Sequence, residues 1–211
     1  MHKIKITLIN LLLICFCFHA KCQSNLKQNF DKKDYHILFI GNSLTYTNNL
    51  PLLVKKHAKS QGINVKTKTV AYPNYAITDH WNEGEVQKLI SSKAFDFVVI
   101  QQGPSSQAEG KKMLIDDGKK YSILCKNNNT KLAYFMVWPS LQYYHTFDGV
   151  IKNYQLATKL NNAILCPVGE VWRKHFDETE NFDYYDSDGF HPSKKGSEVA
   201  AKVIVTTLFN K

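Results

Sequence analysis

Short apolar runs and amphipathic helical stretches alternate along most of the chain, which leaves few folds open to it. The apolar runs are typical of strands and cover 35–40, 64–71, 95–101, 132–138 and 163–168. The expected helices cover 50–61, 78–91, 107–125, 148–160 and 195–209. Strands that alternate with helices form a parallel sheet covered on both faces. The sequence therefore predicts a three-layer α/β domain with five parallel strands.

Polar motifs follow the ends of these expected strands. Ser43 comes after the first strand, Asn74 after the second and Gln102 after the third, while Asp188 and His191 precede the last helix. Ligands of open parallel sheets bind at the carboxyl ends of the strands. We therefore expect these residues, spread over almost 150 positions, to lie along one edge of the sheet.

Ser43, Asp188 and His191 are the residue types of a nucleophile, an orienting carboxylate and a base. A serine hydroxyl is a poor nucleophile unless an imidazole takes its proton, and a carboxylate fixes the tautomer of that imidazole. Asp188 could instead cap nearby backbone amides, and Ser43 alone could be a turn residue. The combination favours a catalytic serine.

These motifs resemble those of the SGNH (GDSL-like) hydrolases. In that family a Gly-Asp/Asn-Ser block carries the nucleophile and an Asp-x-x-His block carries its two partners, and the matching segments here are Gly41-Asn42-Ser43 and Asp188-Gly189-Phe190-His191. The resemblance covers nearly all of residues 23–211. It implies a three-layer, flavodoxin-like SGNH hydrolase fold and a serine-dependent carboxylic-ester hydrolase that uses no metal or cofactor.

The two middle blocks depart from the family pattern. The family places a glycine after its second strand, whose amide helps to bind the oxyanion, and this chain has Tyr72-Pro73-Asn74-Tyr75-Ala76 there. After its third strand the family has Gly-x-Asn-Asp, where this chain has Gln101-Gln102-Gly103-Pro104-Ser105-Ser106. The carbohydrate acetylesterase branch carries Gln-Gly-Glu-Ser at that point. The resemblance implies three oxyanion donors: the Ser43 amide, Gln102 and the Asn74 amide.

Two groups of nearby residues allow other interpretations. His80 is a second candidate base, although a histidine on a helix is more often a hydrogen-bonded structural residue. Asp186 and Asp188 before Gly189 have part of a calcium-loop spacing, but Tyr184 and Lys195 would occupy the first and twelfth ligand positions. We therefore expect no metal.

The expected substrate is a small-molecule or carbohydrate ester. Tyr143 and Tyr144, in a polar loop after the fourth strand, are candidates for stacking on a substrate ring. The resemblance favours removal of O-acetyl or other short acyl groups from a carbohydrate. The alternatives are a lysophospholipase or thioesterase, and a catalytically impaired carbohydrate-binding relative.

Residues 1–22 have the pattern of a signal peptide: a basic start, an apolar stretch from Ile6 to Phe18, and small residues near Cys22. A retained anchor is the alternative, and Lys21 argues against lipid attachment at Cys22. We expect a secreted or periplasmic protein, with 23–211 as one hydrolase domain and no stable membrane insertion after removal of the signal.

Charge and cysteines add two expectations. Removing residues 1–22 takes three of the 27 basic side chains and none of the 18 acidic ones, which leaves an excess of 6 positive charges. These lysines occur as scattered pairs, which predicts a solvated surface and no nucleic-acid partner. Cys125 and Cys166 could form a disulfide or remain buried thiols.

Overall fold

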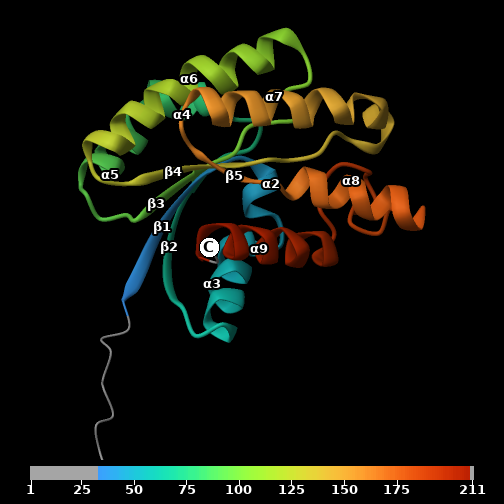
Figure 1. Ribbon diagram of the computed structural model, residues 1–211, viewed down its shortest axis with the longest axis horizontal. Helices are drawn as coiled ribbons and strands as arrows, with labels where there is room; N and C mark the ends of the chain where they lie inside the picture. The colour runs from blue at the N-terminus through green and yellow to red at the C-terminus, as the bar shows by residue number, and fades with distance from the viewer. Residues whose placement is uncertain (1–32, 210–211) are drawn as a thin grey trace, which may run out of the picture. The chain divides into compact units, whose positions relative to one another are not determined.

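A five-stranded parallel sheet forms the centre of the computed structural model, which describes residues 33–209 (Figure 1). Its strands are β1 (Asp34–Gly41), β2 (Asn64–Ala71), β3 (Phe97–Ile100), β4 (Lys131–Phe135) and β5 (Ile164–Cys166). They lie in the order β2-β1-β3-β4-β5, and every neighbouring pair is parallel. Residues 37–40 of β1 pair with both neighbours and are fully buried. The predicted fold is confirmed, with a flavodoxin-like strand order.

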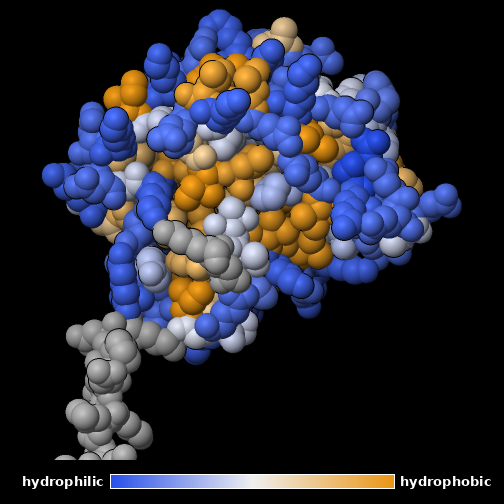
Figure 2. Space-filling model, in the orientation of Figure 1, coloured by the Kyte–Doolittle hydropathy of each residue, from blue (hydrophilic) through white to orange (hydrophobic). Residues whose placement is uncertain are grey.

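Helices cover both faces of this sheet. Figure 1 shows α3, α8 and α9 on one face and α4, α5, α6 and α7 on the other. The helical segments are α2 (Ser43–Tyr46), η1 (Thr47–Asn49), α3 (Leu50–Ser60), α4 (Ile77–Glu83), α5 (Glu85–Ser91), α6 (Ala108–Asn127), η2 (Leu141–Thr146), α7 (Phe147–Leu160), α8 (Val168–Thr179) and α9 (Lys194–Phe209). The space-filling view shows a mainly hydrophilic surface with separate apolar patches (Figure 2).

Several predicted elements differ in their bounds from the structure, and the strands expected over 95–101 and 163–168 are shorter, at Phe97–Ile100 and Ile164–Cys166. The helix expected over 78–91 is two helices, because Gly84 has a φ of 81° and ends α4. The strand expected over 132–138 ends at Phe135. Met136 still donates a hydrogen bond to the Cys166 carbonyl over 3.1 Å, and the chain then leaves the sheet toward Pro139.

Helix α8 was not predicted, although its sequence carries a helical signal. Val168, Trp172 and Phe176 recur four residues apart and are buried. The Trp172 ring stacks on Trp138 with centroids 3.4 Å apart and planes 12° apart. This helix therefore packs a large aromatic surface beside the end of β4, where the sheet edge expected to bear the site lies.

The structure leaves both cysteines of the domain unpaired and buried. Burial raises the pKa of the Cys125 thiol to about 12 and that of the Cys166 thiol to about 12, so both are inert as nucleophiles.

Within residues 33–209, no helix is long and apolar enough to cross a membrane. The expected signal peptide, residues 1–22, lies outside the described residues.

We predict that Trp172→Ala lowers the free energy of unfolding by about 3–5 kcal/mol, because it removes a fully buried indole and leaves a cavity. Val171→Ala, on the exposed side of the same helix, is the control and should change it by no more than about 0.5 kcal/mol. Urea unfolding curves of the two variants measure the difference. Equal effects would show that α8 is held by something other than this aromatic contact.

Candidate active site

Ser43 is the first residue of α2, immediately after the buried strand β1. Asn42 precedes it as the N-cap, with its side-chain oxygen accepting a hydrogen bond from the Leu44 amide over 3.1 Å. The Asn42 side-chain nitrogen donates to the Tyr75 carbonyl over 3.0 Å. The turn that carries Ser43 is thereby joined to the turn that follows β2.

The Gln101 side chain stabilises this turn by hydrogen bonds, which the sequence did not predict. Its side-chain oxygen accepts hydrogen bonds from the Asn42 amide over 2.9 Å and from the Thr45 hydroxyl over 2.8 Å, and the residue is buried. A Cβ atom at Gly41 would collide with both the Thr45 hydroxyl and the Gln101 side-chain oxygen. Glycine at 41 is therefore required for this close approach.

The structure brings together the three predicted residues. Ser43 Oγ lies 2.9 Å from His191 Nε2, and His191 Nδ1 lies 2.5 Å from Asp188 Oδ2. An ionised carboxylate can only accept, so Nδ1 carries a proton and Nε2 is the ring atom that can accept from the Ser43 hydroxyl. This is the geometry of a serine, a general base and its orienting carboxylate.

Asp188 contacts both the His191 ring and nearby backbone amides. Its Oδ1 accepts hydrogen bonds from the Phe190 and His191 amides, each over 2.9 Å, while Oδ2 contacts the His191 ring. The hydrogen bond from His191 lowers the pKa of Asp188, and the two amides act in the same direction. Asp188 is therefore charged at neutral pH and fixed in orientation.

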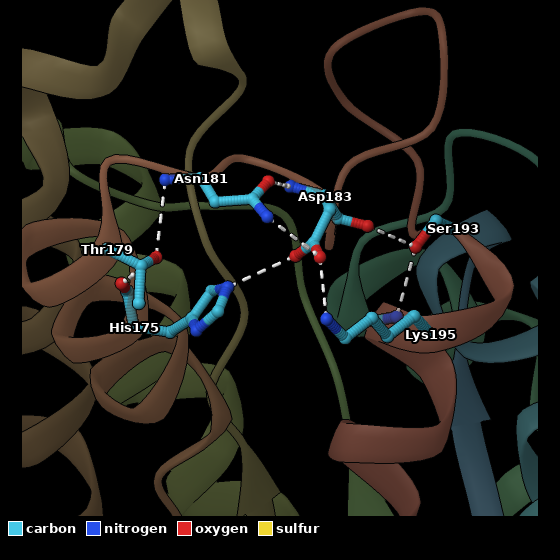
Figure 3. A network of polar contacts seen from close by, with 7 residues as sticks. His175, Thr179, Asn181, Asp183, Ser193 and Lys195 are labelled. Carbon is cyan, nitrogen blue, oxygen red and sulfur yellow. Dashed lines mark hydrogen bonds and ion pairs between the residues drawn. The ribbon is translucent and has the colours of Figure 1, made fainter.

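The loop of residues 184–193 carries Asp188 and His191 and is closed at its base. Ser193 donates its amide to the Tyr184 carbonyl over 2.8 Å. Figure 3 shows the network beneath this closure, in which the Asp183 carboxylate contacts His175 of α8 at 3.1 Å and Lys195 of α9 at 2.6 Å. The network ties the two helices that flank the loop to each other.

The tip of the 184–193 loop rests on the segment after β4. Trp138 donates its indole hydrogen to the Phe190 carbonyl over 3.0 Å, and the Leu141 amide donates to the Gly189 carbonyl over 2.7 Å. The Tyr185 hydroxyl donates to the Pro139 carbonyl over 2.7 Å. The position of His191 is thus fixed by hydrogen bonds of neighbouring loop residues as well as by those of its own ring.

The predicted oxyanion role of Gln102 does not fit this geometry. Its amide nitrogen donates to Ser105 Oγ over 3.0 Å and to the Gly110 carbonyl over 3.2 Å, so both of its hydrogens are engaged. The side chain is buried and stabilises the loop between β3 and α6. The reason for the failed prediction is the closeness of Gly110, which the sequence did not show.

The Ser43 and Asn74 amides remain as candidate donors. Within residues 33–209, no group accepts a hydrogen bond from the Ser43 amide. Asn74 lies in a turn closed by a hydrogen bond from the Tyr75 amide to the Tyr72 carbonyl, and its φ is 62°. That left-handed conformation is the one glycine adopts most easily and asparagine tolerates.

His80, the second candidate base, is a structural residue. It is buried, and its Nε2 lies 2.7 Å from the Gly41 carbonyl, which can only accept a hydrogen bond. Burial lowers the pKa of His80, so the ring is neutral. This histidine supports the end of β1 through the Gly41 carbonyl.

An apolar hollow of about 440 Å³ adjoins the 184–193 loop. Its lining includes Phe190, Pro104, Pro139 and the predicted substrate contact Tyr143, whose side chain is exposed. Tyr144 does not line this hollow, because its hydroxyl donates to Asp177 of α8 over 3.0 Å. Successive residues of η2 point in different directions, so only one of the two predicted tyrosines faces the hollow.

Two other observations concern ligand sites. A larger hollow of about 640 Å³ is lined by Lys119, Lys126 and Lys131 and lies where β4 and β5 begin, at the opposite edge of the sheet. Within the part of the chain that the structure describes, no three His, Cys, Asp or Glu side chains gather as a metal ion would need.

Comparisons with known proteins support the fold. No protein-family model matches the sequence, and no curated protein matches it. A Slackia heliotrinireducens protein assigned to the SGNH hydrolases is 22% identical, with a TM-score of 0.70 over 83% of this chain and 100% of its own. A lipase/acylhydrolase from Enterococcus faecalis is 16% identical, with a TM-score of 0.66 over 81% and 93%.

A catalytic mutant of Axe2, an acetylxylan esterase from Geobacillus stearothermophilus, is 11% identical, with a TM-score of 0.65 over 85% of this chain and 97% of its own. At these identities the likeness concerns the fold. The chain therefore has the fold of the SGNH hydrolases, as the motifs at its two ends predict.

We predict that a fluorophosphonate labels Ser43 and that His191→Ala slows this labelling by roughly 10³-fold or more, because the hydroxyl loses its base. His80→Ala should slow it far less, since the hydrogen bond of the His80 ring is to the Gly41 carbonyl and not to Ser43. Mass spectrometry of each folded variant measures the labelled fraction over time, with Ser43→Ala as the blank. A slower reaction in His80→Ala than in His191→Ala would reverse the assignment of the base.

Proposed function

We propose that the protein is a serine carboxylic-ester hydrolase of the SGNH type. The observation that carries this proposal is the unbroken line of contacts from Ser43 Oγ through the His191 ring to Asp188. Within residues 33–209, no other histidine ring forms a hydrogen bond with a serine hydroxyl. A serine activated in this way performs acyl transfer, and an SGNH fold supports the assignment to esters.

In the proposed reaction, Ser43 Oγ attacks the ester carbonyl while His191 Nε2 takes its proton. Asp188 holds the ring and stabilises the imidazolium that forms. The Ser43 and Asn74 amides donate to the oxyanion of the tetrahedral intermediate. His191 then returns the proton to the leaving alcohol. Water, activated by the same histidine, attacks the acyl-serine and releases the acid.

Asn74 is proposed as a donor because of its backbone conformation. The family's second block has a glycine at this point, and the left-handed φ of 62° at Asn74 gives the chain a glycine-like turn there. The hydrogen bond from Asn42 to the Tyr75 carbonyl ties this turn to the nucleophile's own turn. Two preorganised backbone donors would then act without Gln102.

We propose a carbohydrate ester as the substrate, with an acetyl or other short acyl group removed. The third-block resemblance and the exposed Tyr143 beside the hollow support this assignment. Among proteins of similar fold, Axe2 is an acetylxylan esterase. The hollow would then hold part of the sugar, with Phe190 and Tyr143 against its apolar face.

A lysophospholipase or thioesterase is the second candidate, and the apolar lining of the same hollow favours it. The loops that follow the strands are short or polar in sequence, and this predicts no binding site for a long acyl chain. The structure nevertheless has an apolar hollow beside Phe190. That hollow could take an acyl chain in place of a sugar. The two candidates differ in which half of the ester occupies it.

We also propose that the protein is exported and acts outside the cytoplasm, on a small-molecule or carbohydrate ester. The pattern of residues 1–22 supports export. The scattered lysine pairs support the absence of a nucleic-acid partner.

We predict that Ser43→Ala abolishes hydrolysis of 4-nitrophenyl acetate and leaves the melting temperature nearly unchanged, since the hydroxyl is the attacking group and adds little packing. Turnover and thermal melting of the same preparation measure both effects. Retained turnover in the folded variant would remove Ser43 as the nucleophile. A parent protein that binds acetylated oligosaccharides without hydrolysing them would instead support the impaired, carbohydrate-binding alternative.

We predict that kcat/KM is highest for acetyl esters and falls beyond a few carbons, because the hollow is proposed to hold the alcohol. If it held the acyl chain, each buried methylene would gain about 0.8 kcal/mol, or roughly fourfold in kcat/KM. A series of 4-nitrophenyl esters from acetyl to decanoyl, measured below micelle-forming concentrations, separates these cases. A maximum at octanoyl or longer would favour the phospholipase or thioesterase.

A further inference from the structure

One side chain links the segment of the nucleophile to the segment of the base. Asn48 lies in η1, five residues after Ser43, and its Nδ2 donates to the Pro192 carbonyl over 2.9 Å and to Ser197 Oγ over 3.0 Å. Pro192 follows His191 in the chain, and Ser197 is buried in the first turn of α9. The two hydrogens of one amide thus hold both the loop end and the helix behind it.

This link is unusual among the contacts of the 184–193 loop. Within residues 33–209, the hydrogen bonds that join 42–49 to 184–197 are those of Asn48 and the bond between Ser43 and His191. The bonds made by Trp138, Leu141 and Pro139 fix the loop to the segment after β4. Those bonds hold the loop against the segment after β4, whereas the bonds of Asn48 join its end to the segment that carries Ser43.

The backbone at Asn48 has an uncommon conformation that its surroundings must stabilise. Asn48 and Asn49 both have a φ of 54°, so two successive residues are left-handed between α2 and α3. Asparagine tolerates this conformation better than most residues, and such backbone persists where its surroundings determine it. The two residues differ in their side chains, because Asn49 makes no capping hydrogen bond to α3.

We propose that Asn48 is a positioning residue, whose amide holds the backbone beside His191 at the distance from Ser43 that proton transfer requires. This proposal rests on the esterase function proposed above. Asn48 does not contact the reacting atoms, so its loss should reduce the rate of the chemical step and leave substrate binding nearly unchanged. A displacement of about 1 Å at reacting atoms can cost roughly 10²-fold in rate.

The test compares Asn48→Gly with Asn49→Gly in the full chain. Glycine adopts a φ of 54° freely, so each variant keeps its backbone and the pair isolates the Asn48 amide. Steady-state hydrolysis of 4-nitrophenyl acetate gives kcat and KM, and a fluorophosphonate gives the labelling rate of Ser43. Asn48→Gly should lower kcat and the labelling rate roughly 10- to 100-fold with KM within about twofold. Asn49→Gly should match the parent.

Asn48→Asp is the second variant, because it keeps the shape of asparagine but its carboxylate cannot donate to the Pro192 carbonyl. It should show the same loss. All rates are measured well below each variant's melting temperature, so that unfolding does not contribute. Parent-like labelling in both Asn48 variants, a loss that Asn49→Gly shares, or a rise in KM alone would each overturn the positioning role.

The same experiment separates failure of this proposal from failure of the proposed function. A parent protein that labels and hydrolyses, with Asn48 variants that do so equally well, refutes only the positioning role. A parent that neither labels with the fluorophosphonate nor hydrolyses any ester refutes the esterase function, and the positioning role with it.

Discussion

The arrangement of the site depends on one buried acceptor, the side-chain oxygen of Gln101. The chain leaves β1 at Gly41, and the next amide and the Thr45 hydroxyl are both buried donors that need a partner. Gln101, at the end of the neighbouring strand, satisfies both. With these groups paired, the Ser43 hydroxyl contacts His191, and within residues 33–209 the Ser43 amide has no acceptor. The position of Ser43 therefore depends on hydrogen bonds that satisfy buried donors at the end of β1.

The reacting atoms lie on a boundary between two groups of elements. Ser43 belongs to a group formed by β1, α2 and the turn after β2, which Asn42 joins through the Tyr75 carbonyl. His191 belongs to a group formed by the segment after β4, α8 and α9, which Trp138 and the Asp183 network hold together. Few hydrogen bonds cross this boundary, which makes the bridge formed by Asn48 important.

The sequence was sufficient to predict the fold and the closeness of Ser43, Asp188 and His191, for physical reasons. Parallel strands end at one edge, so motifs that follow strands meet there, and the Asp188-x-x-His191 spacing lets one carboxylate reach both a ring and two amides. The sequence could not show which group an individual side chain contacts. Gln101 and Gln102 are adjacent amides at the end of one strand, yet one supports the nucleophile and the other supports a neighbouring loop. Tyr143 and Tyr144 diverge in the same way.

The exposure of the triad has a consequence for the fate of an acyl-enzyme. The side chains of His191 and Asp188 are 34% and 49% exposed. In such a polar setting, Asp188 would stabilise an imidazolium only modestly, and its two amide hydrogen bonds fix the orientation of its carboxylate toward the ring. Bulk water also reaches the base directly. In the proposed hydrolysis, the water that attacks the acyl-serine would therefore reach His191 from the bulk solvent, without a separate channel through the protein.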